Sequence, residues 1–390
     1  MNKKKVNLYY VRTFISLIIL IAFLRKKNNK NNDRLLIVNR QFFSRKVINK
    51  CKNFLKIYFS SIEFINYKRG TLNSKNYLSY HFKRSAEVKK LSILIKKIIS
   101  KYTIKKIYSG GDDIEYAVFK LTKKRKPTFY IEHGHGNLIA SIISQKKINY
   151  KSYIYNIFIK ILFSAKILYY GPIKWEGYIT LFGNRFRNSF LKKNLIVDRS
   201  YLGFSPLVKK IIVSKESVNI IIDQLISCLK LKKNLKKNFI LLAVGNTSLH
   251  QDPKQSKILI SKILKLINKK KDIVLIKNKK KINKKGTWVN KGNFQKALLK
   301  KIKKQKIKFK IIDSFPLNEL PFEVMPKLFK AKIIISEFSS VPFFSEILFN
   351  KVSIYVYDKY YSSNENHSDV DLVKNIINLY KKGFKKINFF

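Results

Sequence analysis

The segment KVNLYYVRTFISLIILIAFLRKKNNKNNDRLLIV, residues 5–38, decides the fold class of this chain. It predicts a strand at residues 5–11, a helix at residues 13–26 and a second strand at residues 34–38. The helix is apolar on nearly every side up to Leu24, as expected of a helix whose two faces are both covered. Such a strand–helix–strand unit begins a parallel sheet with helices on its faces.

The apolar run from Thr13 to Leu24 also suggests two membrane-related interpretations, a spanning anchor and a signal peptide. Its twelve residues rise only about 18 Å, whereas the hydrocarbon core of a bilayer is roughly 30 Å thick. Extending the run backward meets Arg12 and Asn7, and no small-residue cleavage site follows it. We therefore predict an internal helix of a cytoplasmic protein, with the anchor and the signal peptide as alternatives.

Strands and helices alternate along the rest of the chain, which predicts parallel, doubly wound sheets. Further strands are expected at residues 104–108, 128–132, 178–182, 239–244, 273–276, 309–312, 333–335 and 352–357. Further helices are expected at residues 85–100, 112–121, 256–268, 294–304, 340–348 and 369–382. We predict two Rossmann-type α/β domains, residues 1–206 and 236–390, which are joined by a helical connection at residues 207–235. Two such domains facing each other across a cleft describe the GT-B-like arrangement.

The composition excludes several classes of protein. Apolar residues make up 46%, which excludes global disorder, and two cysteines, Cys51 and Cys228, exclude a disulfide scaffold and most zinc modules. Lys and Arg number 83 against 22 Asp and Glu, a net charge of +61, which attracts polyanions such as anionic lipids and acidic glycans. The basic residues are spread along the whole chain, which argues against a dedicated nucleic-acid patch.

The first candidate site follows the strand at residues 128–132. Glu132 stands where that strand ends, and ligands of open α/β sheets bind at the carboxyl ends of strands. A carboxylate there can take a proton from an attacking hydroxyl, and the glycines that follow let an acceptor approach the backbone. An ordinary polar loop remains the alternative. His133 and His135 lack a third ligand nearby, so we expect no metal.

The second half of the chain contributes two further candidates. Ser339 and Ser340 stand at a predicted helix start, where free N–H groups and two hydroxyls favour a phosphate; simple helix capping is the alternative. Glu323 follows Pro321 by two residues and could accept both hydroxyls of a ribose. Asp112 and Asp113 also stand at the start of a predicted helix, and we interpret Asp112 as the cap of that helix.

These segments together resemble motifs of bacterial GT-B sialyltransferases, especially the polysialyltransferase-like and lipooligosaccharide sialyltransferase families. Glu132-His133-Gly134 stands at the acidic motif of the first domain and Ser339-Ser340 at the paired-serine motif of the second. Residues 320–324 and 7–13 resemble further segments of that group. The sequence departs from the pattern at His133, where a second acidic residue is expected. It departs again at Lys277, where a His-Pro motif would follow residues 273–276.

The resemblance implies transfer of sialic acid, or a related nonulosonic acid, from a CMP-activated donor to a glycan hydroxyl by inverting direct displacement. It places Glu132 as the base, with His133 in the same motif. It places Ser339 and Ser340 at the CMP phosphate and Glu323 at the ribose. Lys277, which is no motif match, could supply positive charge to the phosphate in place of the absent His, and Gly245 is a further candidate for donor binding. No cofactor and no metal are implied. The acceptor would be an anionic glycan or glycolipid of capsule or lipopolysaccharide biosynthesis, and the enzyme would contact the anionic inner face of the membrane peripherally.

Three alternatives remain open. A CDP-donor polyol-phosphate transferase of the GT-B type also ends in a serine pair, and its His-Gly-Thr motif matches His133 and Gly134 in its first two residues. A non-catalytic GT-B protein that binds nucleotide or glycan would explain the absent His-Pro motif. A nucleic-acid-binding function would rest on charge alone.

Overall fold

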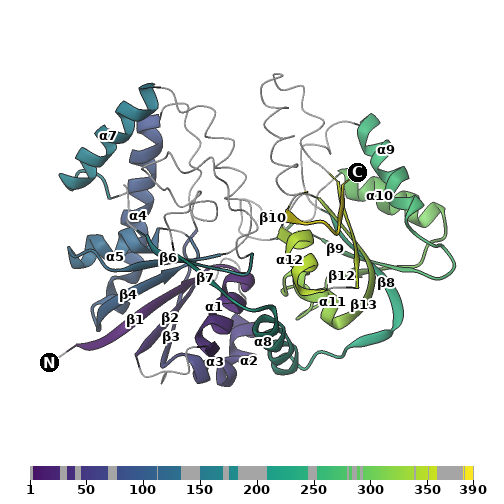
Figure 1. Cartoon of the computed structure of the whole chain (residues 1–390), viewed down its shortest axis with the longest axis horizontal. Helices are drawn as coiled ribbons and strands as arrows, with labels where there is room; N and C mark the ends of the chain where they lie inside the picture. Colours follow the sequence, from purple (N-terminus) through teal and green to yellow (C-terminus); the bar gives the residue numbers. More distant parts are fainter. Residues whose placement is uncertain are drawn as a thin grey trace. The chain divides into compact units, whose positions relative to one another are not determined.

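The computed structural model describes residues 3–26, 33–39, 45–68, 77–111, 113–132, 150–169, 175–182, 209–244, 253–278, 281–282, 288–289, 293–337, 340–349, 351–357, 381 and 383–389. The chain forms two compact units, Met1–Cys228 and Leu229–Phe390, and each is described by itself (Figure 1).

The first unit contains a seven-stranded sheet in the order β3-β2-β1-β4-β5-β6-β7. Every neighbouring pair of strands is parallel. The strands are β1 (Lys4–Val11), β2 (Arg34–Asn39), β3 (Ser61–Ile65), β4 (Tyr102–Ser109), β5 (Thr128–Ile131), β6 (Trp175–Thr180) and β7 (Lys210–Ile212). This is the Rossmann order with one added strand, and the direction of winding reverses between β1 and β4.

Helices cover both faces of this sheet. The described helices are α1 (Phe14–Lys26), α2 (Arg45–Lys50), α3 (Lys52–Tyr58), α4 (Tyr77–Ile99), α5 (Ile114–Thr122), α7 (Tyr150–Ser164) and α8 (Lys215–Cys228). α4 and α5 share one core with Leu8 and Tyr10 of β1. On the opposite face Tyr9 packs edge-to-face against Phe59, just after α3, and Phe23 of α1 lies beside Tyr108.

The apolar helix α1 is an internal element of the first unit. Every residue from Phe14 to Leu24 is buried, and the helix contacts α8 and α3 as well as β1, β5 and β6. The predicted strand–helix–strand unit is therefore confirmed. None of the helices in the described ranges combines the length and the apolar character needed to cross a membrane.

The second unit repeats the same strand order. Its parallel sheet reads β12-β9-β8-β13-β14-β15, which is again 3-2-1-4-5-6 when counted from the first strand of the unit. The strands are β8 (Asn234–Val244), β9 (Ile273–Asn278), β12 (Phe309–Ile312), β13 (Phe329–Glu337), β14 (Ser353–Tyr357) and β15 (Ile387–Phe389). A short antiparallel pair, β10 (Lys281–Ile282) with β11 (Trp288–Val289), lies outside this sheet.

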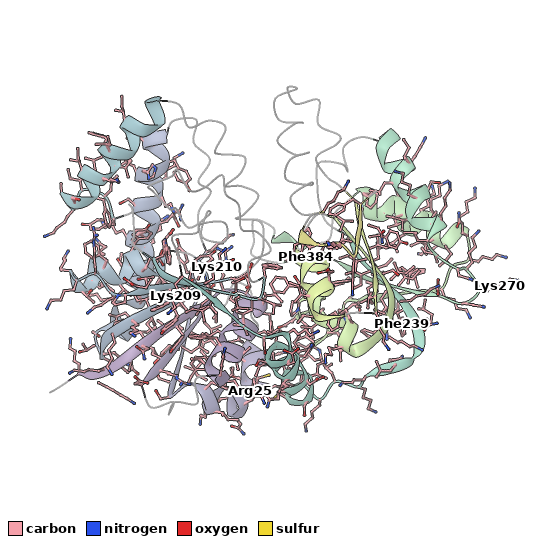
Figure 2. All side chains as sticks on the ribbon, viewed as in Figure 1. Arg25, Lys209, Lys210, Phe239, Lys270 and Phe384 are labelled. Carbon is pink, nitrogen blue, oxygen red and sulfur yellow. The ribbon has the colours of Figure 1, made fainter. Side chains whose placement is uncertain are left out.

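The helices of the second unit again enclose an apolar core. They are α9 (Pro253–Lys265), α10 (Asn293–Lys304), the 3-10 turn η4 (Phe322–Val324), α11 (Met325–Leu328) and α12 (Ser340–Leu348). α9 and α10 pack on β8, β9 and β13 through one apolar cluster. On the α12 side, the fully buried Phe384 lies 4.9 Å, between ring centroids, from Phe343, whereas Lys270 extends into solvent (Figure 2).

The predicted fold class, two doubly wound α/β domains in one chain, is confirmed by the two sheets. Their placement across a cleft stays a prediction. The span assigned to a helical connection, residues 207–235, contains β7 and α8, and both belong to the first unit because β7 pairs with β6. Helix α4 begins at Tyr77, ahead of the predicted residue 85, and the predicted helix at 369–382 lies almost wholly outside the described residues.

Candidate functional site

Glu132 lies at the carboxyl end of β5, as the sequence predicts, and its side chain is completely buried. Its backbone N–H donates to the carbonyl oxygen of Ile179 in β6 at 3.0 Å, so the residue is still anchored to the sheet. The hydroxyl of Thr180, where β6 ends, donates a hydrogen bond to Oε2 of Glu132. That hydroxyl in turn accepts the backbone N–H of Phe182 at 2.9 Å. The carboxylate is therefore held by the end of the neighbouring strand.

Burial changes the acidity of this carboxyl group. Desolvation raises the pKa of Glu132 to about 8, and contacts with Thr180, with Tyr178 and with two backbone N–H groups after β6 lower the pKa by less. The charge of Glu132 adds to burial in raising the pKa of Tyr178 well above its ordinary value. Oε1 of Glu132 makes no hydrogen bond to any residue that the structure describes. A carboxyl group that titrates near neutral pH and keeps one oxygen uncommitted suits a general base.

The start of α1 and the end of β4 meet at the same edge, between the strands where the winding reverses. Thr13 caps α1, because its Oγ1 accepts the backbone N–H of Ser16 at 3.2 Å. A Cβ added to Gly110 would lie 3.0 Å from Oγ of Ser16 and 3.6 Å from the carbonyl oxygen of Ile131, the residue before Glu132. A side chain at this position would crowd Ser16, so glycine favours the close approach of α1 to the end of β4. Sequence reasoning did not assign Gly110 to the site, although its position after a buried strand was a usable signal.

Asp113, the neighbour of the predicted cap Asp112, does not cap α5 with its side chain. It occupies the N-cap position of α5 with φ of 58°, and its side chain accepts no capping hydrogen bond. Its carboxylate instead pairs with Arg84, with Oδ1 2.7 Å from Nη2 and Oδ2 3.1 Å from Nε. Nη1 of Arg84 donates to the hydroxyl of Tyr80 at 2.7 Å. Burial of Asp113 favours the guanidinium partner over a helix N–H; Asp112, the predicted cap, lies outside the described residues.

In the second unit the structure brings two of the predicted donor-binding residues into contact. Ser340 begins α12, and its Oγ donates to Oε1 of Glu323 at 2.8 Å. Glu323 belongs to η4 and is buried. Ser339 and Gly245, together with His133 of the first unit, lie outside the described residues.

Lys277 lies near the carboxyl end of β9 in the same sheet. It pairs in register with Ala243 of β8, which pairs with Ser336 of β13. Two strand spacings separate Lys277 from Ser336, about 10 Å. Ser336 is near the end of β13, which leads toward α12 and Ser340. We therefore assign the three described candidates of this unit to the sheet edge where the winding reverses. They are Lys277, Glu323 and Ser340.

No group of three His, Cys, Asp or Glu side chains with the arrangement of a metal site occurs among the residues that the structure describes. His133 and His135 are not among those residues. The expectation that the reaction needs no metal therefore stays a prediction.

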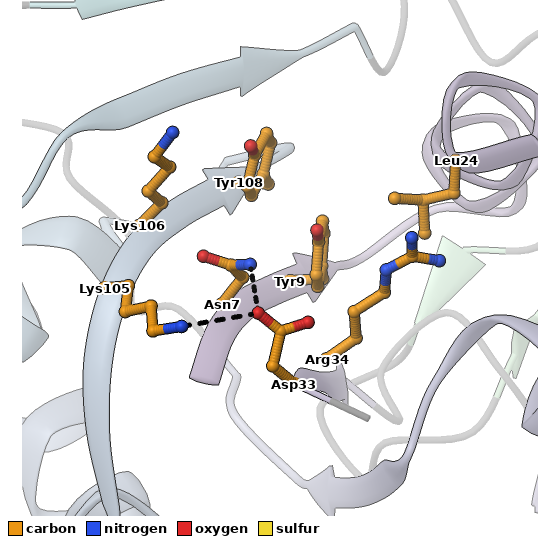
Figure 3. A pocket seen from close by; sticks show the side chains of 8 residues that line it. All are labelled: Asn7, Tyr9, Leu24, Asp33, Arg34, Lys105, Lys106 and Tyr108. Atoms are coloured by element: carbon orange, nitrogen blue, oxygen red, sulfur yellow. Dashed lines mark hydrogen bonds and ion pairs between the residues drawn. The ribbon is translucent and has the colours of Figure 1, made fainter. Parts of the chain in front are cut away.

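A separate pocket of about 280 Å³ lies on the first sheet toward the amino ends of its strands (Figure 3). A register shift between β1 and β4 places both Lys105 and Lys106 of β4 opposite Asn7. Asp33 accepts a hydrogen bond from Asn7 at 3.2 Å and lies 3.7 Å from the ammonium of Lys105. Tyr9, Leu24, Arg34 and Tyr108 complete the lining. Because ligands of open α/β sheets bind at the opposite edge, we do not assign the nucleotide to this pocket.

No family model matches this chain, and no curated protein matches it. Among solved structures it is similar to a sialyltransferase from Photobacterium damsela, with 12% sequence identity, 99% of this chain and 81% of that chain covered, and a TM-score of 0.48. It is also similar to UDP-GlcNAc 2-epimerase from Methanocaldococcus jannaschii, with 14% identity, coverages of 96% and 92%, and a TM-score of 0.45.

A third similar structure is the glycotransferase of kitacinnamycin, with 7% identity, coverages of 100% and 87%, and a TM-score of 0.46. The similar structures thus include both glycosyltransferases and epimerases. Two doubly wound sheets in one chain make up a GT-B glycosyltransferase-like fold. Structural similarities of this size do not indicate the activity, the donor or the acceptor. Those have to be argued from the residues of this chain.

Proposed function

We propose that this chain is a glycosyltransferase that moves sialic acid, or a related nonulosonic acid, from a CMP-activated donor to a hydroxyl of a surface glycan. The observation that carries the proposal is Glu132, a buried carboxyl group at a strand end with a pKa raised to about 8 and with Oε1 uncommitted. A carboxylate with a raised pKa is a stronger base than an ordinary one, and with a pKa of about 8 half of the group is ionised at about pH 8 and a minor fraction at pH 7.

The proposed reaction is a single displacement. Glu132 takes the proton of the acceptor hydroxyl while the hydroxyl oxygen bonds to the anomeric carbon of the donor. The bond from that carbon to the phosphate oxygen breaks, and CMP leaves with the bonding electrons. Attack from the face opposite to the leaving group inverts the configuration. His133 would lie beside the base in the same motif.

The donor would be held by the second unit. Ser340, with its neighbour Ser339, would donate hydroxyl hydrogen bonds to the single phosphate of CMP at the start of α12. Glu323, which contacts Ser340, would accept the hydroxyls of the ribose, and Gly245 would let the donor approach the backbone after β8. Lys277 would place a positive charge near the phosphate as it departs. We propose no metal, because one phosphate carries little charge to neutralise.

The acceptor would be an anionic glycan or glycolipid, such as a precursor of capsule or lipopolysaccharide. A net charge of +61 favours such a partner over a neutral one. The same charge favours a cytoplasmic enzyme that contacts the inner face of the membrane peripherally.

Nucleotide specificity tests the donor. Thermal unfolding of the full chain would be followed with CMP, CDP, UDP and GDP, since a ligand at 100 times its Kd adds about 2.7 kcal/mol of stability. We expect selective stabilisation by CMP. Selective stabilisation by CDP would favour the polyol-phosphate alternative, and a preference for UDP or GDP would contradict a CMP-activated donor.

The variant Glu132→Gln tests the chemistry separately. It keeps size and polarity but cannot accept the proton, so transfer should fall by about 10²–10⁴-fold while CMP still stabilises the protein. Glu176→Gln on the same sheet, at an exposed position of β6, is the matched control and should retain activity. Wild-type protein that binds CMP yet transfers nothing to sialylated or lipopolysaccharide acceptors would make the chain a non-catalytic GT-B protein.

A further inference from the structure

Helix α7 exposes a stripe of large apolar side chains. Ile154, Ile157, Phe158 and Ile161 are 48%, 41%, 44% and 57% exposed. Their spacing of i, i+3, i+4 and i+7 places them on one face of the helix, about 100° wide. We call these four residues the α7 stripe.

The α7 stripe is not the face by which the helix packs on its own unit. Ile159 and Phe163 are buried on the opposite side, and the ring of Phe163 packs edge-to-face on Tyr116 of α5. Tyr169, beyond the helix, is tied to α4 by its backbone N–H, which donates to Oγ of Ser85 at 2.8 Å. Figure 1 shows α7 beside α4 at the rim of the first unit. One apolar face suffices for that packing, so the second one needs another explanation.

The charged residues of α7 and of the segment just after it are all basic. Lys160 on the helix and Lys166 just after it are exposed, and Ile167, 57% exposed, extends the apolar surface. From residue 150 to residue 169 the sequence contains neither Asp nor Glu.

We propose that the α7 stripe docks onto an anionic bilayer surface, with its apolar side chains at the boundary of the acyl chains and the flanking lysines at the headgroups. An apolar helix face with a basic rim is the arrangement of interfacial helices. A second copy of this chain would bring a further +61 charges to the same surface, so self-association there is disfavoured. The proposal gives the expected peripheral membrane contact a defined surface, and it rests on α7 rather than on the proposed sugar transfer.

Vesicle flotation of the full chain tests this inference without donor or acceptor, so its outcome is independent of the proposed reaction. Phosphatidylcholine vesicles with and without phosphatidylglycerol would be compared. We expect binding only with phosphatidylglycerol, weakened as NaCl rises from about 0.1 to about 0.5 M. The double variant Ile157→Asn, Ile161→Asn should bind about tenfold more weakly or worse.

The matched control is the double variant Ile57→Asn, Ile258→Asn, which alters two helix positions that are 64% and 59% exposed. It should bind as wild type does. The charge variant Lys160→Glu, Lys166→Glu keeps the apolar stripe and should also weaken binding, which provides a test if the asparagine variant does not fold. Unchanged binding of a folded α7 variant would overturn the proposal. So would equal binding to neutral vesicles, or a dimer in sedimentation velocity that the α7 variant alone abolishes.

Discussion

The hydroxyl of Thr180 donates its hydrogen bond to Oε2 of Glu132, although the two residues are 48 positions apart in the sequence. They meet because β5 and β6 are neighbours and both end at this edge of the sheet. Since Thr180 also accepts the N–H of Phe182, the direction in which its hydroxyl donates is fixed. Thr180 is therefore a positioning residue that orients one oxygen of the carboxylate and leaves the other available.

Replacing Thr180 tests this role. The variant Thr180→Val keeps the shape but removes the hydroxyl that lowers the pKa of Glu132, so the pKa should rise above about 8. In the proposed reaction, the rising limb of kcat/KM against pH should then move to higher pH. The lost hydrogen bonds should also cost about 1–3 kcal/mol in urea unfolding. Thr180→Ser, which retains the hydroxyl, is the control, and an unchanged pH profile in the valine variant would contradict the positioning role.

Glu132 should also make the stability of the fold depend on pH. Its pKa is about 8 when folded, against 4.5 as an ordinary group, so between these values the folded state binds more protons than the unfolded state. The contribution of Glu132 to the free energy of unfolding therefore falls as pH rises from about 4.5 to about 8. Above that range the contribution is constant. Glu132→Gln removes the effect. Urea unfolding of both proteins at several pH values should show the variant gaining relative stability toward alkaline pH; parallel curves would contradict the raised pKa.

The contact between Ser340 and Glu323 predicts coupling in the second unit. Ser340→Ala leaves a buried oxygen of Glu323 without its donor, so the effects of Ser340→Ala and Glu323→Gln should not add. A double-mutant cycle measured by chemical unfolding should give a coupling of about 0.5–3 kcal/mol. Ser340→Ala should in addition lower CMP affinity about tenfold, for one hydrogen bond to a charged group. If the two substitutions changed the free energy of unfolding additively, the two side chains would act independently.

The ion pair of Arg84 with Asp113 should be important for stability. Their side chains are only 11% and 2% exposed, so Arg84→Met leaves a buried carboxylate without its guanidinium. We expect a loss of about 3–5 kcal/mol in the free energy of unfolding. Lys105→Met is the matched control, because it breaks the more exposed pair with Asp33 and should cost about 1 kcal/mol or less. Equal losses of unfolding free energy in Arg84→Met and Lys105→Met would contradict the expectation that burial makes the Arg84–Asp113 pair more important for stability.

The fold was predictable where strands are buried on both faces. β1 and the centre of β13 are nearly continuous apolar runs, and such runs identify central parallel strands. β3, β7 and β15 were not predicted. β3 is half-exposed, and β7 and β15 are edge strands of three residues each, too short for a periodic pattern.

The site was predictable only as a set of positions at strand and helix ends. Sequence placed Glu132 after a strand and Ser340 at a helix start, and the structure agrees. Their partners depend on strand order and on contacts across the fold, which local spacing does not reveal. Asp113 illustrates the difference, because an Asp at a helix start suggests a cap, whereas its actual partner, Arg84, lies 29 residues earlier on another helix.

The burial of α1 has a consequence for synthesis. Its apolar face is covered in part by α8, which begins only at Lys215. At about 5–20 residues per second, a ribosome takes roughly 10–40 s to reach α8 after completing α1. Throughout that interval the part of α1 that α8 covers stays exposed, so we expect the nascent chain to depend on a chaperone that shields this segment. Ribosome-bound chains ending at Ile212 should be cleaved rapidly by protease, while chains that have released all of the first unit from the tunnel should resist; equal resistance would show that α1 is shielded without α8.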